Sequence, residues 1–473
     1  MSRRGRRSLP TILQRRHTDE FEPPPYDRHE LAAAYRTLAR SDEDARHVGL
    51  QEPAYARSRR GTAAGLRSLN EEYGERFYEV PPEAALDEAA AQECFAGEGS
   101  VIDVQTHFMA DRPELRAMTT RLLDLYRSVA PDWWRGLEGV TAYNMAEYLR
   151  CVFLETENSV AVLTSGPGLD GNRMLFNPEL NAVRELVDRL GPTGRLLQHA
   201  VVHPEVPAEL ERMADYAGGI GHAGWKVYTL GEQQPDGSWR NDWMLDDEAV
   251  GQPFLERARA LGPRLVCTHK GISSLAPAGS PRDIGPAARA FPELDFLVYH
   301  SGYEMPRKGV PLEGPYTEDT LDIGVNRLVR TVEEARLGPG GNVHAELGTT
   351  WFCLIRRPVE AAHVLGKLLR ALGDDNIVWG TDSIWYGPAQ PLIDAFRAFQ
   401  IPEAMREEFG YPELTPESKE KILSRNGARL YGIDLERARE MGEQDDLSWM
   451  GEALEEAKRL GVAGALGPDP ETN

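Results

Sequence analysis

The chain has 473 residues, 41% of them hydrophobic, with 75 acidic and 53 basic side chains and a formal net charge of −22. This length predicts one large domain with additions or two to three domains, and the hydrophobic share is enough for a sizeable core. The acidic balance excludes nucleic acids and anionic membranes as expected partners. No stretch is apolar enough to span a membrane. Four scattered cysteines without a CxxC pair indicate a reducing, cytoplasmic setting.

Residues 1–98 are predicted to form an N-terminal extension. It begins with the basic, proline-rich "MSRRGRRSLPTILQRRHTDEFEPPP" and continues with short helical pieces such as residues 27–48. The paired arginines resemble an export signal, but no apolar stretch follows, so that interpretation is rejected. Two interpretations stay open: a disordered tail, or an assembly arm that wraps a neighbouring subunit.

From 99 to 433 the pattern becomes regular, with short apolar segments alternating with amphipathic ones. This alternation predicts parallel strands joined by right-handed helical crossovers, and closed on itself such a sheet is a (β/α)₈ barrel. An open doubly wound sheet is the alternative, and the lack of a glycine-rich loop after the first strand counts against it. Residues 434–473 predict an acidic helical tail. The predicted strands are 100–107, 159–165, 196–203, 224–229, 264–269, 294–300, 343–349 and 376–382.

The first predicted strand ends in "VIDVQTHF", residues 101–108. Alternate side chains of a strand share a face, so Asp103, Gln105 and His107 are expected to point to one side. That is how a strand presents metal ligands to a pocket, although an amide stands where an imidazole would be the better ligand. A metal site, a weakened one and a polar strand end without chemistry all remain open here.

Polar residues follow the other predicted strands, where a barrel carries its active site. Several histidines and carboxylates on one rim suit a divalent cation such as Zn²⁺, Fe²⁺ or Mn²⁺. His199 and His344 lie inside their strands and are interpreted as core residues. The strand ends carry His107, Thr164, Ser165, His203, Lys226, His269, His300, Glu346 and Asp382.

Four of these segments resemble the amidohydrolase superfamily, in its amidohydrolase-related branch with aminocarboxymuconate-semialdehyde decarboxylase and the resorcylate-type decarboxylases. The segments are "IDVQTH", "VCTH", "FLVYHSGYE" and "VWGTDSIWYGP", and "KILSRNGARLYGI" is similar to the terminal helix of the branch. The resemblance covers roughly residues 99–433, in the order that the barrel predicts.

The resemblance implies a role for each matching residue. His107 and His269 match metal ligands, and Asp382 matches the carboxylate that binds metal and accepts a proton from its water. Gln105 falls where the first ligand would be, so a Gln105→His variant is expected to hold metal more tightly. His300 matches the histidine that activates water or polarises the substrate. The sites implied are therefore metal ligands His107, His269, Asp382 and Gln105, with His300 and Asp382 catalytic.

Lys226 ends the fourth strand, where some superfamily members carry a carbamylated lysine that bridges two metals. The favoured interpretation is a barrel-interior lysine paired with a carboxylate such as Glu346. The rim is also rich in aromatic residues, and Trp351 and Trp385 are predicted to bind substrate. Weaker candidates for the pocket wall are Trp133, Trp134, Phe352 and Tyr386. Arg173 and Arg327 are either carboxylate clamps or solvated surface groups.

The ligand set predicts an enzyme that acts on a small organic acid or amide, by hydrolysis or non-oxidative decarboxylation through metal-activated water. Zinc is the first expectation, with iron or manganese as alternatives. The alternative function is a subunit of a two-component, iron-dependent hydroxylase of the same superfamily, similar to a 2-aminoisobutyrate hydroxylase. That subunit would hold a structural metal while a homologous barrel partner carries the catalytic site. A homo-oligomer or such a hetero-oligomer is therefore expected.

Overall fold

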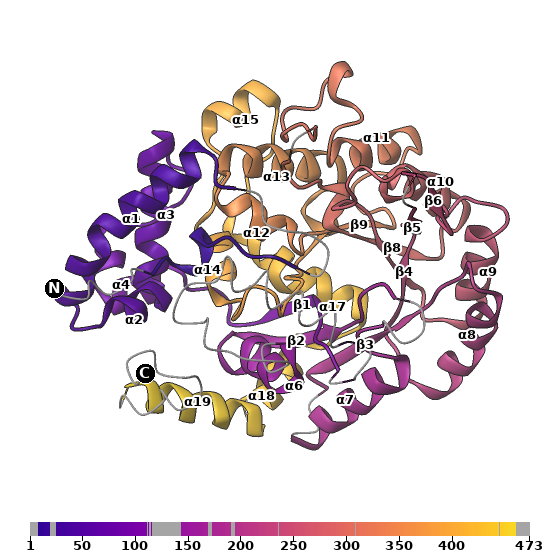
Figure 1. Cartoon of the computed structure of the whole chain (residues 1–473), viewed down its shortest axis with the longest axis horizontal. Helices are drawn as coiled ribbons and strands as arrows, with labels where there is room; N and C mark the ends of the chain where they lie inside the picture. The colour runs from indigo at the N-terminus through magenta and orange to yellow at the C-terminus, as the bar shows by residue number, and fades with distance from the viewer. Residues whose placement is uncertain are drawn as a thin grey trace.

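Eight short buried strands lie side by side in chain order in this computed structural model (Figure 1). Every neighbouring pair is parallel, and the strands fall within the predicted segments except that β2 begins one residue earlier, at Asn158. A short antiparallel hairpin, β5 (Glu232–Gln233) and β6 (Trp239–Arg240), is inserted after the fourth strand. The eight strands are β1 (Val101–Thr106), β2 (Asn158–Leu163), β3 (Leu196–Val201), β4 (Gly224–Tyr228), β7 (Leu265–His269), β8 (Asp295–Tyr299), β9 (Val343–Glu346) and β10 (Ile377–Val378).

The last strand closes onto the first. The Val104 N–H donates to the Trp379 carbonyl at 3.2 Å, and the Asp382 N–H donates to the Gln105 carbonyl at 2.8 Å. A parallel bridge between Thr106 and Ser383 continues the pairing past β10. The sheet is therefore a closed (β/α)₈ barrel, as predicted, and not an open doubly wound sheet.

Amphipathic helices surround the barrel. In α7 (Asn177–Leu190) the buried residues include Leu180, Val183 and Val187, which fall on one helical face. Helix α11 (Asn326–Glu334) begins just after Gly324, which has a φ of 47° and where the Glu313 carboxylate fills the place of a side chain. The other helices of the barrel layer are α6 (Met145–Leu149), α8 (Pro207–Gly219), α9 (Gly251–Leu261), α10 (Ile284–Ala290), α11 (Asn326–Glu334), α12 (Thr350–Ile355), α13 (Pro358–Leu372), α14 (Gln390–Ala398), α15 (Glu403–Phe409), α16 (Pro416–Glu420) and α17 (Asn426–Tyr431).

The N-terminal extension forms α1 (Arg28–His47), α2 (Glu52–Arg57), α3 (Arg59–Tyr73) and α4 (Glu88–Cys94), which gather on one side of the barrel (Figure 1). Asp27 starts α1, since its carboxylate accepts from the N–H groups of His29 and Glu30, each at 2.8 Å. The Tyr78 hydroxyl donates to the Ile355 carbonyl at 2.6 Å. The described part of the extension thus packs on its own barrel, while an arm on a neighbouring subunit remains a prediction.

The C-terminal residues form α18 (Leu435–Gly442) and α19 (Asp446–Arg459). Arg195, just before β3, makes a buried ion pair with Asp445 at 3.0 Å, which ties this tail to the barrel. Tyr431, at the end of α17, reaches the barrel interior, where its hydroxyl lies 2.8 Å from His199 Nε2. His199 is thus a hydrogen-bonded core residue.

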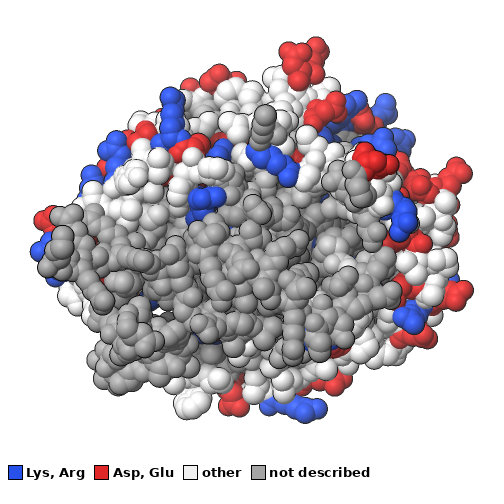
Figure 2. Space-filling model, viewed as in Figure 1, with Lys and Arg blue, Asp and Glu red and all other residues white. Residues whose placement is uncertain are grey.

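Acidic and basic side chains are interspersed around the edge of the face in Figure 2. In the part of the chain that the structure describes, no helix is long and apolar enough to cross a membrane. The described residues are 8–18, 25–110, 112, 115, 143–168, 173–190, 194–234, 236–307, 309–443 and 445–459.

Candidate active site

Strand β1 departs from simple alternation at the site. Ile102 and Val104 pack in the barrel interior, so Asp103 between them faces the surrounding helices. Its carboxylate accepts from the N–H of Thr381 at 2.9 Å and from the Thr381 hydroxyl. The pairing of β1 with β2 shifts register just after Asp103, and this bulge turns Gln105 towards the interior. The expectation of one shared face is therefore wrong for Asp103.

Asp382 is the centre of the site. Its Oδ1 accepts from the side-chain nitrogen of Gln105 at 2.9 Å and lies 3.0 Å from His107 Nε2. Its Oδ2 accepts from the Thr349 hydroxyl. The other ring nitrogen of His107, Nδ1, lies 3.2 Å from the carbonyl of Thr164. Burial raises the pKa of Asp382, but the hydrogen bond and charge of His107 outweigh it, so this pKa is lowered overall.

His269 and His300 form the second half of the site. Their ring centroids are 4.7 Å apart, edge to face, and His269 also stacks on Tyr228 at 5.2 Å. Burial first, and then the nearby charge of Lys226, lower the pKa of His269 to about 3. His269 is therefore a neutral imidazole near pH 7, which is the state that binds metal. The Nδ1 of His300 lies 2.8 Å from the Gly348 carbonyl.

Lys226 and Glu346 lie between these halves. The Lys226 ammonium sits 3.3 Å from the centre of the Tyr299 ring, a cation–π contact. Glu346 accepts from the backbone N–H groups of His300 at 3.0 Å and Gly348 at 2.5 Å. Burial raises the pKa of Glu346 to about 8, and the charge of Lys226 opposes that rise. Lys226 and Glu346 interact electrostatically. Lys226 also contacts the Tyr299 ring, and Glu346 also contacts backbone N–H groups.

The backbone is strained where these side chains project. His300, Ser301, Thr349 and Asp382 have φ values of 62°, 53°, 55° and 60°, in the left-handed region. Such residues cost on the order of 1–3 kcal/mol each and cluster at functional sites. Hydrogen bonds hold them, including one from the Ser301 hydroxyl to the Glu346 carbonyl at 2.7 Å. All four follow the C-terminal ends of β8, β9 and β10, where barrels carry active sites.

The two tryptophans predicted to bind substrate have different surroundings. Trp351 packs edge-on against Phe396 at 5.2 Å and donates its N–H to a carbonyl of α14. Trp351 is therefore a buried residue whose ring and N–H both engage α14, and its role in substrate binding stays a prediction. Trp385 lies 5.4 Å from Tyr143, whose hydroxyl is 3.1 Å from His17 of the N-terminal extension. Its role in substrate binding stays a prediction.

The two candidate carboxylate clamps are buried and paired. Arg173 lies 3.4 Å from Glu209, and Arg327 lies 3.1 Å from Glu304. Arg173 therefore pairs with Glu209 of α8, and Arg327 of α11 pairs with Glu304, so both guanidinium groups are engaged inside the protein.

Thr349 is a side chain of the site that sequence reasoning missed. It touches Asp382 and the Tyr386 hydroxyl, and the signal for it was its place at the end of the predicted strand 343–349. Trp133 and Trp134 lie outside the described residues.

The predicted metal ligands are only partly assembled. Among the described residues, no group of three or more His, Cys, Asp or Glu side chains is arranged to hold a metal ion. The donor chemistry nevertheless fits a divalent cation, since His107 and Asp382 meet at 3.0 Å and His269 is a neutral imidazole. The amide oxygen of Gln105 is buried and has no hydrogen-bond partner among the described residues.

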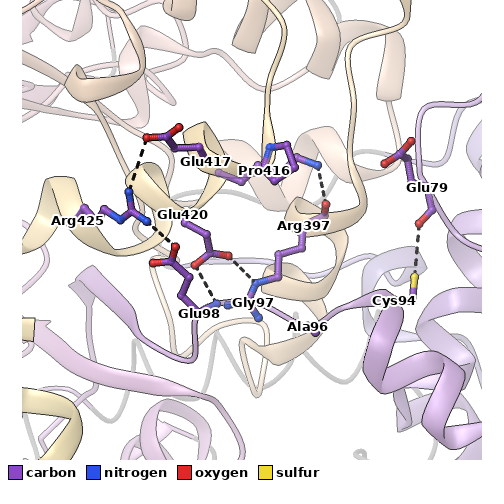
Figure 3. Close-up of a pocket in the computed structure, with 11 residues that line it drawn as sticks. Glu79, Cys94, Ala96, Gly97, Glu98, Arg397, Pro416, Glu417, Glu420 and Arg425 are labelled. Carbon is purple, nitrogen blue, oxygen red and sulfur yellow. Dashed lines mark hydrogen bonds and ion pairs between the residues drawn. The ribbon is translucent and has the colours of Figure 1, made fainter. Parts of the chain in front are cut away.

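A separate cavity of about 580 Å³ lies at the other end of the barrel, between the extension and the last helices (Figure 3). Both of its arginines pair with glutamates. Arg397 lies 3.3 Å from Glu420, and Arg425 contacts Glu98. Lys419 donates to the carbonyl of Arg397 at 2.6 Å. We call this region the seam, and its pairing indicates a structural junction.

The amidohydrolase family model matches residues 102–433. Three solved structures match this chain. An uncharacterised TIM-barrel protein from Bordetella bronchiseptica is 16% identical over 72% of this chain and 99% of its own, with a TM-score of 0.42. A 2,6-dihydroxybenzoate decarboxylase is 15% identical over 70% and 98%, with a TM-score of 0.41. A dihydropyrimidinase from Brevibacillus agri is 15% identical over 70% of each chain, with a TM-score of 0.34. The comparison with curated proteins gave no match.

Proposed function

Because this chain belongs to the amidohydrolase family, we propose that it is a metal-dependent enzyme acting on a small organic acid or amide. The reaction is hydrolysis or non-oxidative decarboxylation. His107, His269 and Asp382 would hold one divalent cation, Zn²⁺ first among the candidates, with Fe²⁺ or Mn²⁺ as alternatives. When bound, such a cation would supply Lewis-acid polarisation of a carbonyl or carboxylate and activation of water.

The contact between His107 and Asp382 carries this proposal. The Thr164 carbonyl can only accept a hydrogen bond, so the proton of a neutral His107 ring sits on Nδ1. Nε2 faces the Asp382 carboxylate at 3.0 Å, with a lone pair when the ring is neutral and with a proton when the ring is charged. Two lone pairs at this distance repel each other unless a proton or a cation lies between them. A buried pair of this kind at a barrel's catalytic end supports a cation site.

The chain's own residues supply the remaining chemistry. The Gly348 carbonyl holds His300 through Nδ1, so Nε2 is the ring nitrogen that exchanges a proton with the substrate. Asp382 is the second proton acceptor. His107, His269 and His300 are all buried, which limits bulk water and strengthens electrostatic interactions with the reacting groups.

Metal analysis tests the proposal. Protein purified without chelator is expected to contain about one metal ion per chain, and His107→Ala, His269→Ala and Asp382→Ala to contain far less. His363→Ala is the matched control, because His363 lies on α13 and its Nδ1 is 2.9 Å from the Tyr411 hydroxyl. Full metal content in all three site variants would refute the assignment. Release of CO₂ or of an amine from a panel of small acids and amides then separates decarboxylation from hydrolysis.

A second proposal concerns assembly. The chain would be one subunit of a two-component, iron-dependent hydroxylase, with a structural metal here and the catalytic site in a homologous barrel partner. Gln105 favours this, because it supplies an amide where a catalytic member would have a stronger ligand. Co-expression with a homologous barrel protein, followed by light scattering and metal analysis, tests it. A chain that stays a homo-oligomer and turns over substrate alone would count against it.

A further inference from the structure

The orientation of the Gln105 side chain bears on its role. Its nitrogen, Nε2, lies 2.9 Å from Asp382 Oδ1. A carboxylate only accepts hydrogen bonds, so the hydrogen-bond network fixes the NH₂ end of the amide towards Asp382. The oxygen, Oε1, is the atom of this amide that could bind a metal. It is turned away from Asp382.

Two glycines make room for this arrangement. A Cβ at Gly348 would lie 2.3 Å from Gln105 Oε1 and 2.5 Å from Glu346 Oε1. A Cβ at Gly380 would lie 2.0 Å from Glu346 Oε1 and 3.2 Å from Gln105 Cβ. Gln105 Oε1 therefore points at the backbone of Gly348, beside Glu346. The bulge in β1 supplies the inward turn, and the glycines supply the space.

We infer that Gln105 is a positioning residue: it orients the Asp382 carboxylate and is not itself a metal ligand. This role rests on the proposed function, because it concerns the carboxylate that would bind the metal. Asp382 projects from a backbone with a φ of 60°. Gln105 and His107 from the β1 side and Thr349 from the β9 side fix both of its oxygens. Groups that orient a ligand in this way tune its affinity for metal.

A Gln105→Glu variant separates the two roles. It replaces the NH₂ donor with a carboxylate oxygen that faces Asp382, so metal retention against a chelator is expected to fall about 10- to 100-fold. If Gln105 were a ligand, the added charge would strengthen the site and retention would rise. Retention that rises or stays unchanged overturns the inference.

The control is Gln198→Glu. Gln198 is a buried glutamine of β3 whose side chain donates to the Ile220 carbonyl at 2.7 Å. This variant also buries a new carboxylate in a barrel strand, but it should leave metal retention unchanged. If metal retention fell in both variants, the loss would come from general destabilisation of the barrel, and the inference would be overturned.

Side-chain amide NMR of the metal-free full chain tests the contact without a metal. With ¹⁵N-labelled glutamine, the signal of Gln105 is the one missing in Gln105→Leu. Its NH₂ group should exchange slowly with water in the wild type and at least tenfold faster in Asp382→Ala. Equal exchange in both proteins overturns the inference. A slow amide in a wild type that binds no metal supports the contact and defeats the metal proposal, so the two failures are distinguishable.

Discussion

The two ends of the barrel differ in how their charged side chains are arranged. At the seam, Arg397 lies between Glu157 and Glu420, and Arg425 contacts Glu98 and Glu417. At the catalytic end, described above, carboxylates and imidazoles are buried beside one another on strained backbone. The ion pairs of the seam thus attach the extension to the barrel and stabilise the fold. The catalytic end is less stable, because it holds closely spaced titratable groups with perturbed pKa values.

The largest expected effect is at the seam. Arg397→Ala removes the buried cation between Glu157 and Glu420 and leaves Glu157 with the more distant Arg59, at 3.9 Å. This change should lower the free energy of unfolding by about 3–5 kcal/mol. Urea denaturation measures it. The matched control is Arg425→Ala, whose side chain is 41% exposed and should lose at most about 1 kcal/mol. Equal losses of unfolding free energy in the two variants would show that burial of the ion pair makes no difference here.

The pH dependence of stability should also report on the seam. Burial lowers the pKa of Lys419 from 10.5 to about 8. Between these values the unfolded chain holds a proton that the folded chain has lost, so stability rises with pH across this window, by up to about 3 kcal/mol. The difference in unfolding free energy between wild type and Lys419→Met, measured from pH 8 to 10.5, isolates the effect. A difference that does not change with pH would contradict it.

At the catalytic end, Thr349→Val removes the hydroxyl that donates to Asp382. A lost hydrogen bond to a charged group should lower the free energy of unfolding by about 2 kcal/mol and weaken metal retention as well. Thr349→Ser keeps the donor and should stay near wild type in both measurements. Chemical denaturation and chelator competition on the same samples check this, and a Val variant that equals the Ser variant would show that the hydroxyl has no role.

The smallest expected effect concerns the attachment of the extension. Tyr78→Phe removes the hydroxyl that donates to the Ile355 carbonyl at 2.6 Å, which should reduce the free energy of unfolding by about 1 kcal/mol. Tyr73→Phe is the control, because its hydroxyl lies 3.4 Å from the Arg356 carbonyl, and its loss should be smaller. Thermal unfolding compares the stabilities of the two variants. A larger loss of stability for Tyr73→Phe would show that the Tyr78 hydroxyl is not the stronger attachment.

Sequence patterns predicted much of the barrel for a physical reason. Buried parallel strands are continuous apolar runs, and the polar residues that end them, such as His269 and Asp382, stand out. The register shift that separates Asp103 from Gln105 was not predictable, because a bulge inserts a residue without changing composition. The positive φ of Thr349 was also not predictable, because only contacts in the folded protein hold a β-branched residue in the left-handed region. The packing of Trp351 against α14 was also not predictable, because its sequence position does not reveal that contact.

Closure of β10 onto β1 has a consequence for how the protein is made. Gln105 and Asp382 are 277 residues apart in sequence. At a synthesis rate of roughly 5–20 residues per second, Asp382 is added on the order of tens of seconds after Gln105. Through that interval the nascent chain carries an open sheet whose first strand lacks its partner. Both edges of that sheet can pair with other chains. A ribosome that stalls before residue 377 would therefore release a chain that lacks β10 and Asp382 and has exposed sheet edges.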